Sequence, residues 1–285
     1  MPVGLRRGTV TAIVERRDGL VRLEVDGARC VAYPRLTGAV ALGDEVLVNV
    51  QARELALGSG GFDVLYANLT RGLGLAPPPG AHVVKLPYTP LQHAVRHAEE
   101  DAALPDGLDG MPVVCCSLHS QVVPVCAALA GRRVAYVQVP GGALPASLSD
   151  AVRVLSERGL VATVVAAAAC FGGDVECVTV ASALLWASRE HDVAVCSIGP
   201  GVVGTGSATG HGGLAAADAA SAARAFGGRP FVAARVSDAD PRERHRGVSH
   251  HTRAVVEASR APVAWPRGWP RPEWLADVRE ADASG

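Results

Sequence analysis

Alternation of apolar and polar residues marks the first 70 positions of the chain. The alternating segments are separated by Asp18-Gly19, Asp26-Gly27 and Gly43-Asp44. Asp-Gly between such segments is typical of tight hairpins, because both turn residues tolerate a positive φ. We therefore expect a small barrel of the oligonucleotide-binding or SH3-like kind. Its predicted strands are 9–14, 20–25, 28–33 and 45–50.

Continuous apolar segments replace this alternation after residue 110. Strands that are apolar along their whole length are buried on both faces, and their alternation with helices predicts a parallel sheet with right-handed crossovers. The predicted fold class is α/β, an open, mostly parallel, Rossmann-like sheet with a small N-terminal β-barrel domain. The strands are expected at 113–116, 134–139, 161–167, 193–198, 231–236 and 262–264, and the helices at 122–130, 147–157, 175–189, 214–226 and 251–259.

These patterns divide the chain into four parts. Thr89-Pro90 predicts the start of a helix that runs to about residue 103, because Thr caps helices and Pro suits the first helical position. In the tail, which is rich in Trp and Pro, we expect Trp265, Trp269 and Trp274 to pack on the domain or on a second subunit. The parts are the all-β domain 1–70, the linker and helix 71–110, the α/β domain 111–264 and the tail 265–285.

Composition narrows the class of protein. Hydrophobic residues make up 49% of the chain, which predicts a sizeable core, and the net charge of −1 disfavours a dedicated nucleic-acid or membrane-surface binder. The longest apolar run, 160–171, is too short to cross a bilayer. Seven cysteines without a CxxC pair are expected to be free thiols. No apolar stretch follows the charges near the start, so we expect a cytoplasmic protein.

Chemically reactive side chains collect in the loops that lead from a strand to the next helix. The loops in the opposite direction are short and plain. Because the carboxyl ends of parallel strands meet at one edge of a sheet, and ligands bind there, we expect the reactive loops to form one site. These loops are 117–121, 140–147, 171–174, 199–213 and 237–251.

The loop 199–213 is rich in glycine. Gly199, Gly201 and Gly204 fit a GxGxxG pattern, but the helix starts too late and Asp238 lies too far along the chain to bind a ribose, so NAD is disfavoured. The amides of such a loop can hold a phosphate or carboxylate, and a purely structural loop is the alternative. The candidate anion-binding residues are Gly199, Gly201, Gly204, Thr205, Gly206, Ser207, Arg242 and Arg244.

The loop 237–251 is the densest in ionisable side chains. Imidazoles with carboxylates suit a divalent metal or acid/base catalysis, and arginine can neutralise an anion. A salt-bridged surface turn is the alternative. The candidate metal ligands are Asp240, His245, His250 and His251, and the candidate catalytic residues are Lys85, His119, Asp174, Asp238 and His245.

Several candidates have simple structural alternatives. Lys85 is the only lysine and would supply a compact positive charge, or it reflects composition alone. His119 would act as a base or be a hydrogen-bonded loop histidine, and Asp174 would meet a metal or cap the helix expected at 175–189. His93 and His97 share one face of the helix expected from residue 89, where a metal pair or a solvent-exposed face fits.

Six segments resemble those of an uncharacterised bacterial family, domain of unknown function 3866, over about residues 5 to 260. They are VVKLPYTPLQ, MPVVCCSLHSQ, GGALPASLS, FGGDVEC, GPGVVGTG and SDADPRERHRGVSHHT. The resemblance supplies no activity. Two loops depart from the family pattern, because Gln138-Val139-Pro140 replaces an expected acid and Ala169 replaces an expected histidine. The stronger candidates for functional residues are then Lys85, Asp174 and the loop 237–251.

Three functions fit these features. The first is a hydrolase or group transferase acting on a phosphorylated or otherwise anionic small molecule, with a divalent metal as a compatible cofactor. The second is a non-catalytic metabolite-binding module with the same anion pocket. The third is a nucleic-acid-binding or assembly protein acting through the barrel arginines Arg6, Arg7, Arg16, Arg17 and Arg22, for which stacking aromatics are scarce. We expect a small anionic ligand rather than a membrane or nucleic acid, and leave a homo-oligomer open.

Overall fold

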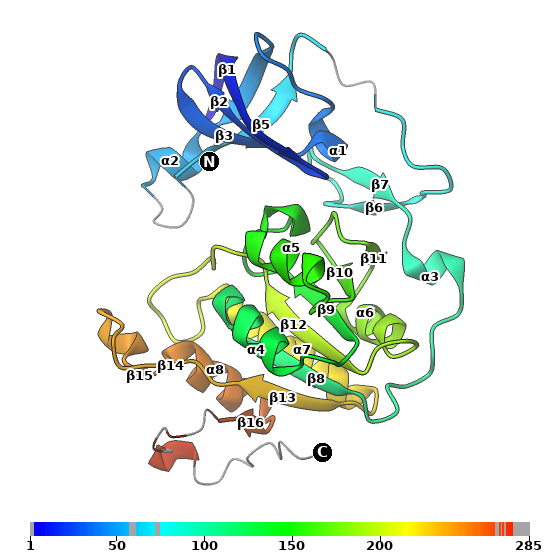
Figure 1. Ribbon diagram of the computed structural model, residues 1–285, viewed down its shortest axis with the longest axis vertical. Helices are drawn as coiled ribbons and strands as arrows, with labels where there is room; N and C mark the ends of the chain where they lie inside the picture. Colours follow the sequence, from blue (N-terminus) through cyan, green and yellow to red (C-terminus); the bar gives the residue numbers. More distant parts are fainter. Residues whose placement is uncertain are drawn as a thin grey trace. The chain divides into compact units, whose positions relative to one another are not determined.

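Two compact units make up the computed structural model, Met1–Val95 and Arg96–Gly285, and each is described by itself (Figure 1). The structure describes residues 3–56, 61–71, 75–265, 268, 270 and 272–275. Among these residues no helix combines the length and the apolar character needed to cross a membrane.

The first unit contains a closed barrel of five strands in the order β1-β2-β3-β5-β4. The β3–β5 pair is parallel and the other four pairs are antiparallel. This order, with helix α1 (Pro34–Thr37) between β3 and β4, is that of the oligonucleotide-binding barrel. The predicted barrel is confirmed, and β5 is the strand that the alternation did not reveal. The strands are β1 (Leu5–Arg17), β2 (Leu20–Val25), β3 (Ala28–Ala32), β4 (Glu45–Asn49) and β5 (Asp63–Asn68).

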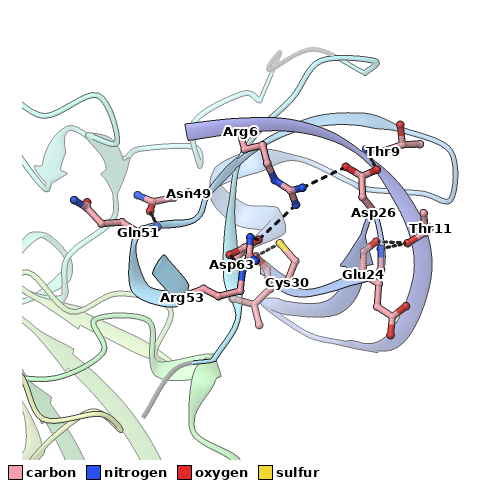
Figure 2. A network of polar contacts seen from close by, with 12 residues as sticks. Arg6, Thr9, Thr11, Glu24, Asp26, Cys30, Asn49, Gln51, Arg53 and Asp63 are labelled. Carbon is pink, nitrogen blue, oxygen red and sulfur yellow. Dashed lines mark hydrogen bonds and ion pairs between the residues drawn. The ribbon is translucent and has the colours of Figure 1, made fainter. Parts of the chain in front are cut away.

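Charged side chains of this barrel pair with one another (Figure 2). The buried Asp63 carboxylate accepts hydrogen bonds from Arg53 Nε at 2.9 Å and Nη2 at 3.1 Å, where Arg53 belongs to α2 (Gln51–Glu54). Arg6 lies 3.9 Å from Asp63 and 3.8 Å from Asp26. Local acids also pair with Arg7, Arg17 and Arg22, whereas Arg16 donates to a backbone carbonyl. Little positive charge is therefore left for a nucleic-acid phosphate backbone.

The segment after the barrel differs from the predicted helix. It forms a hairpin of β6 (Val83–Lys85) and β7 (His93–Val95), followed by the short α3 (Ala98–Asp101). The backbone at Leu86 and Tyr88 has positive φ, and the Thr89 hydroxyl donates to Leu86 O at 2.8 Å, so this threonine closes a turn rather than opening a helix. His93 and His97 consequently do not share a helix face.

The second unit is built on a seven-stranded sheet in which all neighbouring strands are parallel, in the order β11-β10-β9-β12-β8-β13-β16 (Figure 1). This confirms the predicted α/β class. Its strands are β8 (Pro112–Cys116), β9 (Val134–Val139), β10 (Thr163–Ala167), β11 (Val175–Cys177), β12 (Val193–Ile198), β13 (Arg229–Ala233) and β16 (Val263–Ala264).

Helices cover both faces of the sheet. In β9, Tyr136 packs in a cluster with α4 (Val122–Ala128) and α5 (Asp150–Glu157), whereas its neighbours Ala135 and Val137 face α6 (Val180–Ala187), α7 (Ala215–Ala225) and α8 (His250–Ser259). Successive side chains of a strand point to opposite faces of the sheet, so each strand contributes to the hydrophobic core on both faces. The cysteines are free and buried. Trp265 and Trp274 pack against the second of these cores, and Trp269 lies outside the described residues.

One predicted helix boundary is wrong at the edge of this sheet. Residues Val175–Cys177 form the strand β11, and the helix begins only at Val180, where the Thr179 hydroxyl accepts from Ser182 N at 3.0 Å. Thr179 is therefore the N-cap, and Asp174 is not. The short strand was missed because three residues carry too little periodicity to separate a strand from the first turn of a helix.

Candidate functional site

Four histidine rings meet at the carboxyl edge of the parallel sheet. His211 lies in the loop after β12, His245 in the arm after β13, and His250 and His251 in the first turn of α8. The ring centroids of His211 and His251 are 4.0 Å apart, and those of His250 and His251 are 4.2 Å apart. His245 lies 4.8 Å from His250 and 5.1 Å from His251. The loops 199–213 and 237–251 therefore converge.

Three of these imidazoles can share one metal ion. One ring nitrogen from each of His211, His250 and His251 lies within 4.8 Å of those of the other two. Nδ1 of His211, Nε2 of His250 and Nδ1 of His251 are buried, and none of them makes a hydrogen bond within the described structure. Buried polar atoms normally have a partner, so these three nitrogens are candidates for the atoms that would bind a metal.

The protonation states of the group favour metal binding. His211 Nε2 donates to Ala208 O at 2.9 Å, which leaves the lone pair on Nδ1. Burial, reinforced by neighbouring positive charge, lowers the pKa of His251 to about 3 and that of His245 to about 4. Burial also lowers the pKa of His211 and of His250. Neutral imidazole is the form that binds metals, so the group is neutral and ready to coordinate at physiological pH.

Glycines position His211 by letting two loops cross backbone to backbone. A Cβ on Gly212 would lie 1.9 Å from Gly141 O, and one on Gly199 would lie 2.1 Å from Ala143 O. Hydrogen bonds from Val203 N to Gly141 O and from Ala143 N to Pro200 O fasten the crossing. The glycines at 141 and 142 and those at 199 and 212 thus serve close packing, which fixes the residue beside His211.

Ser249 holds the start of α8, which carries two of the histidines. Its hydroxyl oxygen accepts from His251 N at 3.3 Å and lies 2.8 Å from His245 Nδ1. Ser249 N donates to Arg235 O, and Arg235 N donates to the Thr252 hydroxyl at 2.9 Å. His245 therefore braces the helix that presents His250 and His251, while its own nitrogens are not members of the three-histidine group.

Asp240 does not join the histidines, in contrast to its prediction as a metal ligand. Its carboxylate accepts from Arg235 Nη2 at 2.6 Å and from Arg242 Nε and Nη2 at 3.0 and 3.1 Å. Hydrogen bonds from Arg242 and Arg235 hold the pKa of Asp240 well below its ordinary value. Both carboxylate oxygens are therefore occupied, because two guanidinium groups bind the same acid. Asp240 thus anchors the arm that runs from β14 (Val236–Ser237) to β15 (Gly247–Val248).

The glycine-rich loop uses its polar groups internally. Thr205 N donates to Gly210 O at 2.7 Å, Gly210 N donates to the Ser207 hydroxyl at 2.9 Å, and the hydroxyls of Thr205 and Ser207 lie 2.9 Å apart. The residues 201–210 are exposed, and Gly204 pairs with His211 in an isolated bridge. The loop therefore closes on itself between Thr205 and Gly210, which engages the hydroxyls of Thr205 and Ser207.

The remaining predicted catalytic residues are not members of the three-histidine group. His119 Nδ1 donates to Ile198 O at 3.0 Å and Nε2 lies 2.7 Å from the Ser149 hydroxyl, so both ring nitrogens are engaged. The Asp174 carboxylate accepts from Val164 N at 2.8 Å near the amino end of β10, at the opposite edge of the sheet. Lys85 is buried on β6 in the first unit, and Asp238 is exposed.

Sequence reasoning missed His211 as a member of the histidine group. It stands alone between glycines in the loop 199–213, which the glycines made look like an anion cradle. The available signal was topological. Parallel strands bring the loops at the carboxyl edge together, so a histidine in one of these loops is expected near the histidines of the neighbouring loop.

Comparison with known proteins gives a family and a distant structural likeness. The family model described as "Protein of unknown function (DUF3866)" matches residues 29–269. The chain is similar to the crystal structure of YjeQ from Thermotoga maritima at 10% identity and a TM-score of 0.18, covering 90% of this chain and 65% of that chain. The chain thus spans less than two thirds of that structure. No curated protein matches the chain.

Proposed function

This chain belongs to the DUF3866 family, whose description assigns no activity, and from its site we propose a metal-dependent hydrolase or group transferase that acts on a phosphorylated or otherwise anionic small molecule. The observation that carries the proposal is the convergence of His211, His250 and His251 with buried, unpartnered ring nitrogens. Imidazole ligands favour zinc and its neighbours among the transition metals, and three protein ligands with an open fourth position are typical of catalytic zinc.

The hydrogen bonds around the group support a stable metal site. Partners that fix the ring orientation of metal-binding histidines raise metal affinity. Ala208 O fixes the tautomer of His211, and Ser249 fixes the first turn of α8 below His251. His245 in turn contacts Ser249, so it is a positioning residue in this proposal.

The charge of the site supports an anionic substrate. The three proposed ligands are neutral, so a divalent ion would keep its full charge. Arg235 and Arg242 add two positive charges, and Asp240 removes one. An anion would neutralise this excess, and an arginine close to the metal would balance the charge that develops during transfer of a phosphoryl group.

A bound divalent ion would polarise the substrate oxygen and bring the pKa of a water ligand to about 7. In hydrolysis of a phosphate ester, the oxygen of water bonds to phosphorus, the bond to the leaving oxygen breaks, and a proton from water ends on that oxygen. The chain's own contribution is to hold three imidazoles neutral and to keep guanidinium groups beside them.

The proposal is tested first by metal binding. The purified full chain is stripped with a chelator, reloaded with zinc or cobalt(II), and analysed by mass spectrometry for bound metal and by the visible spectrum of cobalt. His211→Ala and His251→Ala should weaken binding by more than about 100-fold, because loss of an outer-shell partner alone costs about 10–100-fold. His82→Ala, at an exposed position of the first unit, is the matched control and should bind metal normally.

Activity is tested second. Zinc- and cobalt-loaded protein is assayed on a panel of phosphate esters and other anionic esters, with the stripped protein and His211→Ala as references. Turnover that requires the metal and His211 supports the proposal. Equal metal binding by His211→Ala contradicts the metal site, and a metal-loaded protein that turns over no member of the panel contradicts the enzymatic part.

A further inference from the structure

We infer that a phosphoryl group of the substrate binds directly to the metal as its fourth ligand and is held from the side by Arg242. This inference rests on the proposed function and adds where the anion binds and which residue selects it. Of the predicted anion-binding residues, the inference assigns phosphate binding to Arg242 and not to the glycine-rich loop 199–213.

The first argument is the make-up of the metal group. Among the described residues, His211, His250 and His251 form the only group of histidine, cysteine and acidic side chains that could hold a metal, and no carboxylate belongs to it. The nearby acid Asp240 has both oxygens engaged by arginines. A dication with three neutral ligands therefore gains most from an anion in the open position, and phosphate oxygens are hard, charged ligands that suit it.

The second argument is the placement of Arg242. The His245 amide donates to Arg242 O at 2.9 Å, and the His245 ring lies 4.8 Å from the ring of His250, so Arg242 lies close to the histidine group. Asp240 fixes this guanidinium through Nε and Nη2, and no hydrogen bond engages Nη1 within the described structure. The side chain is 56% exposed. A fixed, open guanidinium edge beside a metal is suited to a phosphate oxygen.

The third argument concerns the arm that carries Arg242. Arg235 binds Asp240 through Nη2, and its Nη1 donates to His245 O at 3.5 Å. The same arginine joins the backbone of α8 through Ser249 and Thr252. The anchor of Arg242 is thus tied to the helix that presents two of the metal ligands, so guanidinium and metal are held in one frame. Such preorganisation favours charge stabilisation.

The glycine-rich loop offers the anion less. The Gly210 amide and the hydroxyls of Thr205 and Ser207 bond to one another, and the loop carries no charged side chain. It adjoins the metal group through the bridge between Gly204 and His211. It therefore serves as a wall beside the metal, while charge recognition falls to the metal and Arg242.

The test uses the visible spectrum of cobalt(II)-loaded full chain, titrated with inorganic phosphate as the probe and with acetate as a carboxylate probe. Direct coordination should change the bands of the bound cobalt as phosphate is added. Arg242→Gln should weaken phosphate binding roughly tenfold, the size expected for a lost charge-assisted hydrogen bond, while leaving cobalt binding unchanged. Arg253→Gln is the matched control, because Arg253 lies on α8 but pairs with Glu257 on the exposed surface.

The outcomes separate the two proposals. Failure of cobalt to bind overturns the proposed function, and this inference with it. Cobalt binding without a response to phosphate overturns the inference alone, as does phosphate binding that leaves the spectrum unchanged. An acetate response that exceeds the phosphate response overturns the phosphoryl assignment. An unchanged phosphate affinity in Arg242→Gln, or an equal loss in Arg253→Gln, overturns the role of Arg242.

Discussion

The imidazole rings of His211 and His251 stack with their centroids 4.0 Å apart and their planes 19° from parallel. His211 ends a loop that follows β12, and His251 lies in the first turn of α8, which follows a different strand of the same sheet. The stacking therefore requires that the loop after β12 and the start of α8 keep their relative positions. Changes that loosen either loop should appear in metal binding before they appear in global stability.

Removal of the Ser249 hydroxyl should weaken metal binding without unfolding the protein. Ser249→Ala deletes the oxygen that accepts from His251 N and contacts His245. We expect a loss of roughly 10–100-fold in zinc affinity, as for other outer-shell partners, and about 1 kcal/mol in the free energy of unfolding from the lost cap. Competition with a chromogenic chelator measures the affinity. Ser221→Ala, which removes a hydroxyl bonded within α7, should leave the affinity unchanged.

The crossing of the two loops should not tolerate a methyl group. Gly212→Ala would place Cβ 1.9 Å from Gly141 O, so the backbone must move. We expect a destabilisation of at least about 1–3 kcal/mol together with weaker zinc binding. Gly206→Ala is the matched control in the neighbouring turn, because its Cβ would meet no atom within 4 Å. Chemical unfolding and chelator competition on both variants check the prediction, and similar behaviour of the two would refute the packing role.

The buried acid of the barrel should be critical for its stability. Asp63→Asn leaves Arg53 without its anionic partner and leaves Arg6 with Asp26 alone (Figure 2). We expect a loss of about 1–3 kcal/mol, the cost of losing charged hydrogen bonds at a buried group, because the arginines themselves are partly exposed. Glu45→Gln breaks the exposed pair with Arg7 and should cost less than about 1 kcal/mol. Urea unfolding of the full chain, followed by circular dichroism, measures both, and a small effect of Asp63→Asn would contradict the prediction.

His191 should make the metal-free protein less stable in acid. Burial lowers its pKa in the folded state, so the unfolded chain, with an ordinary value of about 6.5, binds the proton more readily. The free energy of unfolding should be constant with respect to this group above about pH 6.5 and fall as the pH drops below it. His191→Gln should reduce that slope, and it should also lower stability at pH 8 by about 1 kcal/mol through the lost contact with Thr163.

The measurement is urea unfolding of the chelator-treated full chain at several pH values between 5 and 8. His82→Gln at an exposed position is the control and should keep the parent slope. A parent slope that persists in His191→Gln would show that other groups carry the acid sensitivity.

Much of the fold could be predicted from periodicity. The β9 and β12 segments are mostly apolar, as expected for strands buried on both faces of a parallel sheet. Both are buried at every position, and both were predicted with their bounds in the structure. The barrel hairpins followed from Asp26-Gly27, where both residues have the positive φ that the turn requires. Long periodic segments carry enough residues for the pattern to exceed chance.

The predictions that were wrong concern residues whose position depends on contacts with distant parts of the chain. Asp174 looked like a site residue because it follows two glycines, yet the chain turns back there to pair beside β10, and this return is invisible locally. The pairing of Asp240 with Arg235 and Arg242 likewise depends on side-chain directions. The convergence of the loops 199–213 and 237–251 could be predicted, because the topology of a parallel sheet alone determines which loops meet at its carboxyl edge.

The three-histidine group combines one residue from the loop after β12 with two from α8, near the end of the described chain. A ribosome that has released residues up to 240 has exposed a nearly complete sheet but only one of the three imidazoles. Under the proposed function, metal binding would have to wait until α8 has left the exit tunnel and docked, since domains fold as units during synthesis. Bound zinc would accordingly be found on chains that extend through α8 and would be missing from chains that end before it.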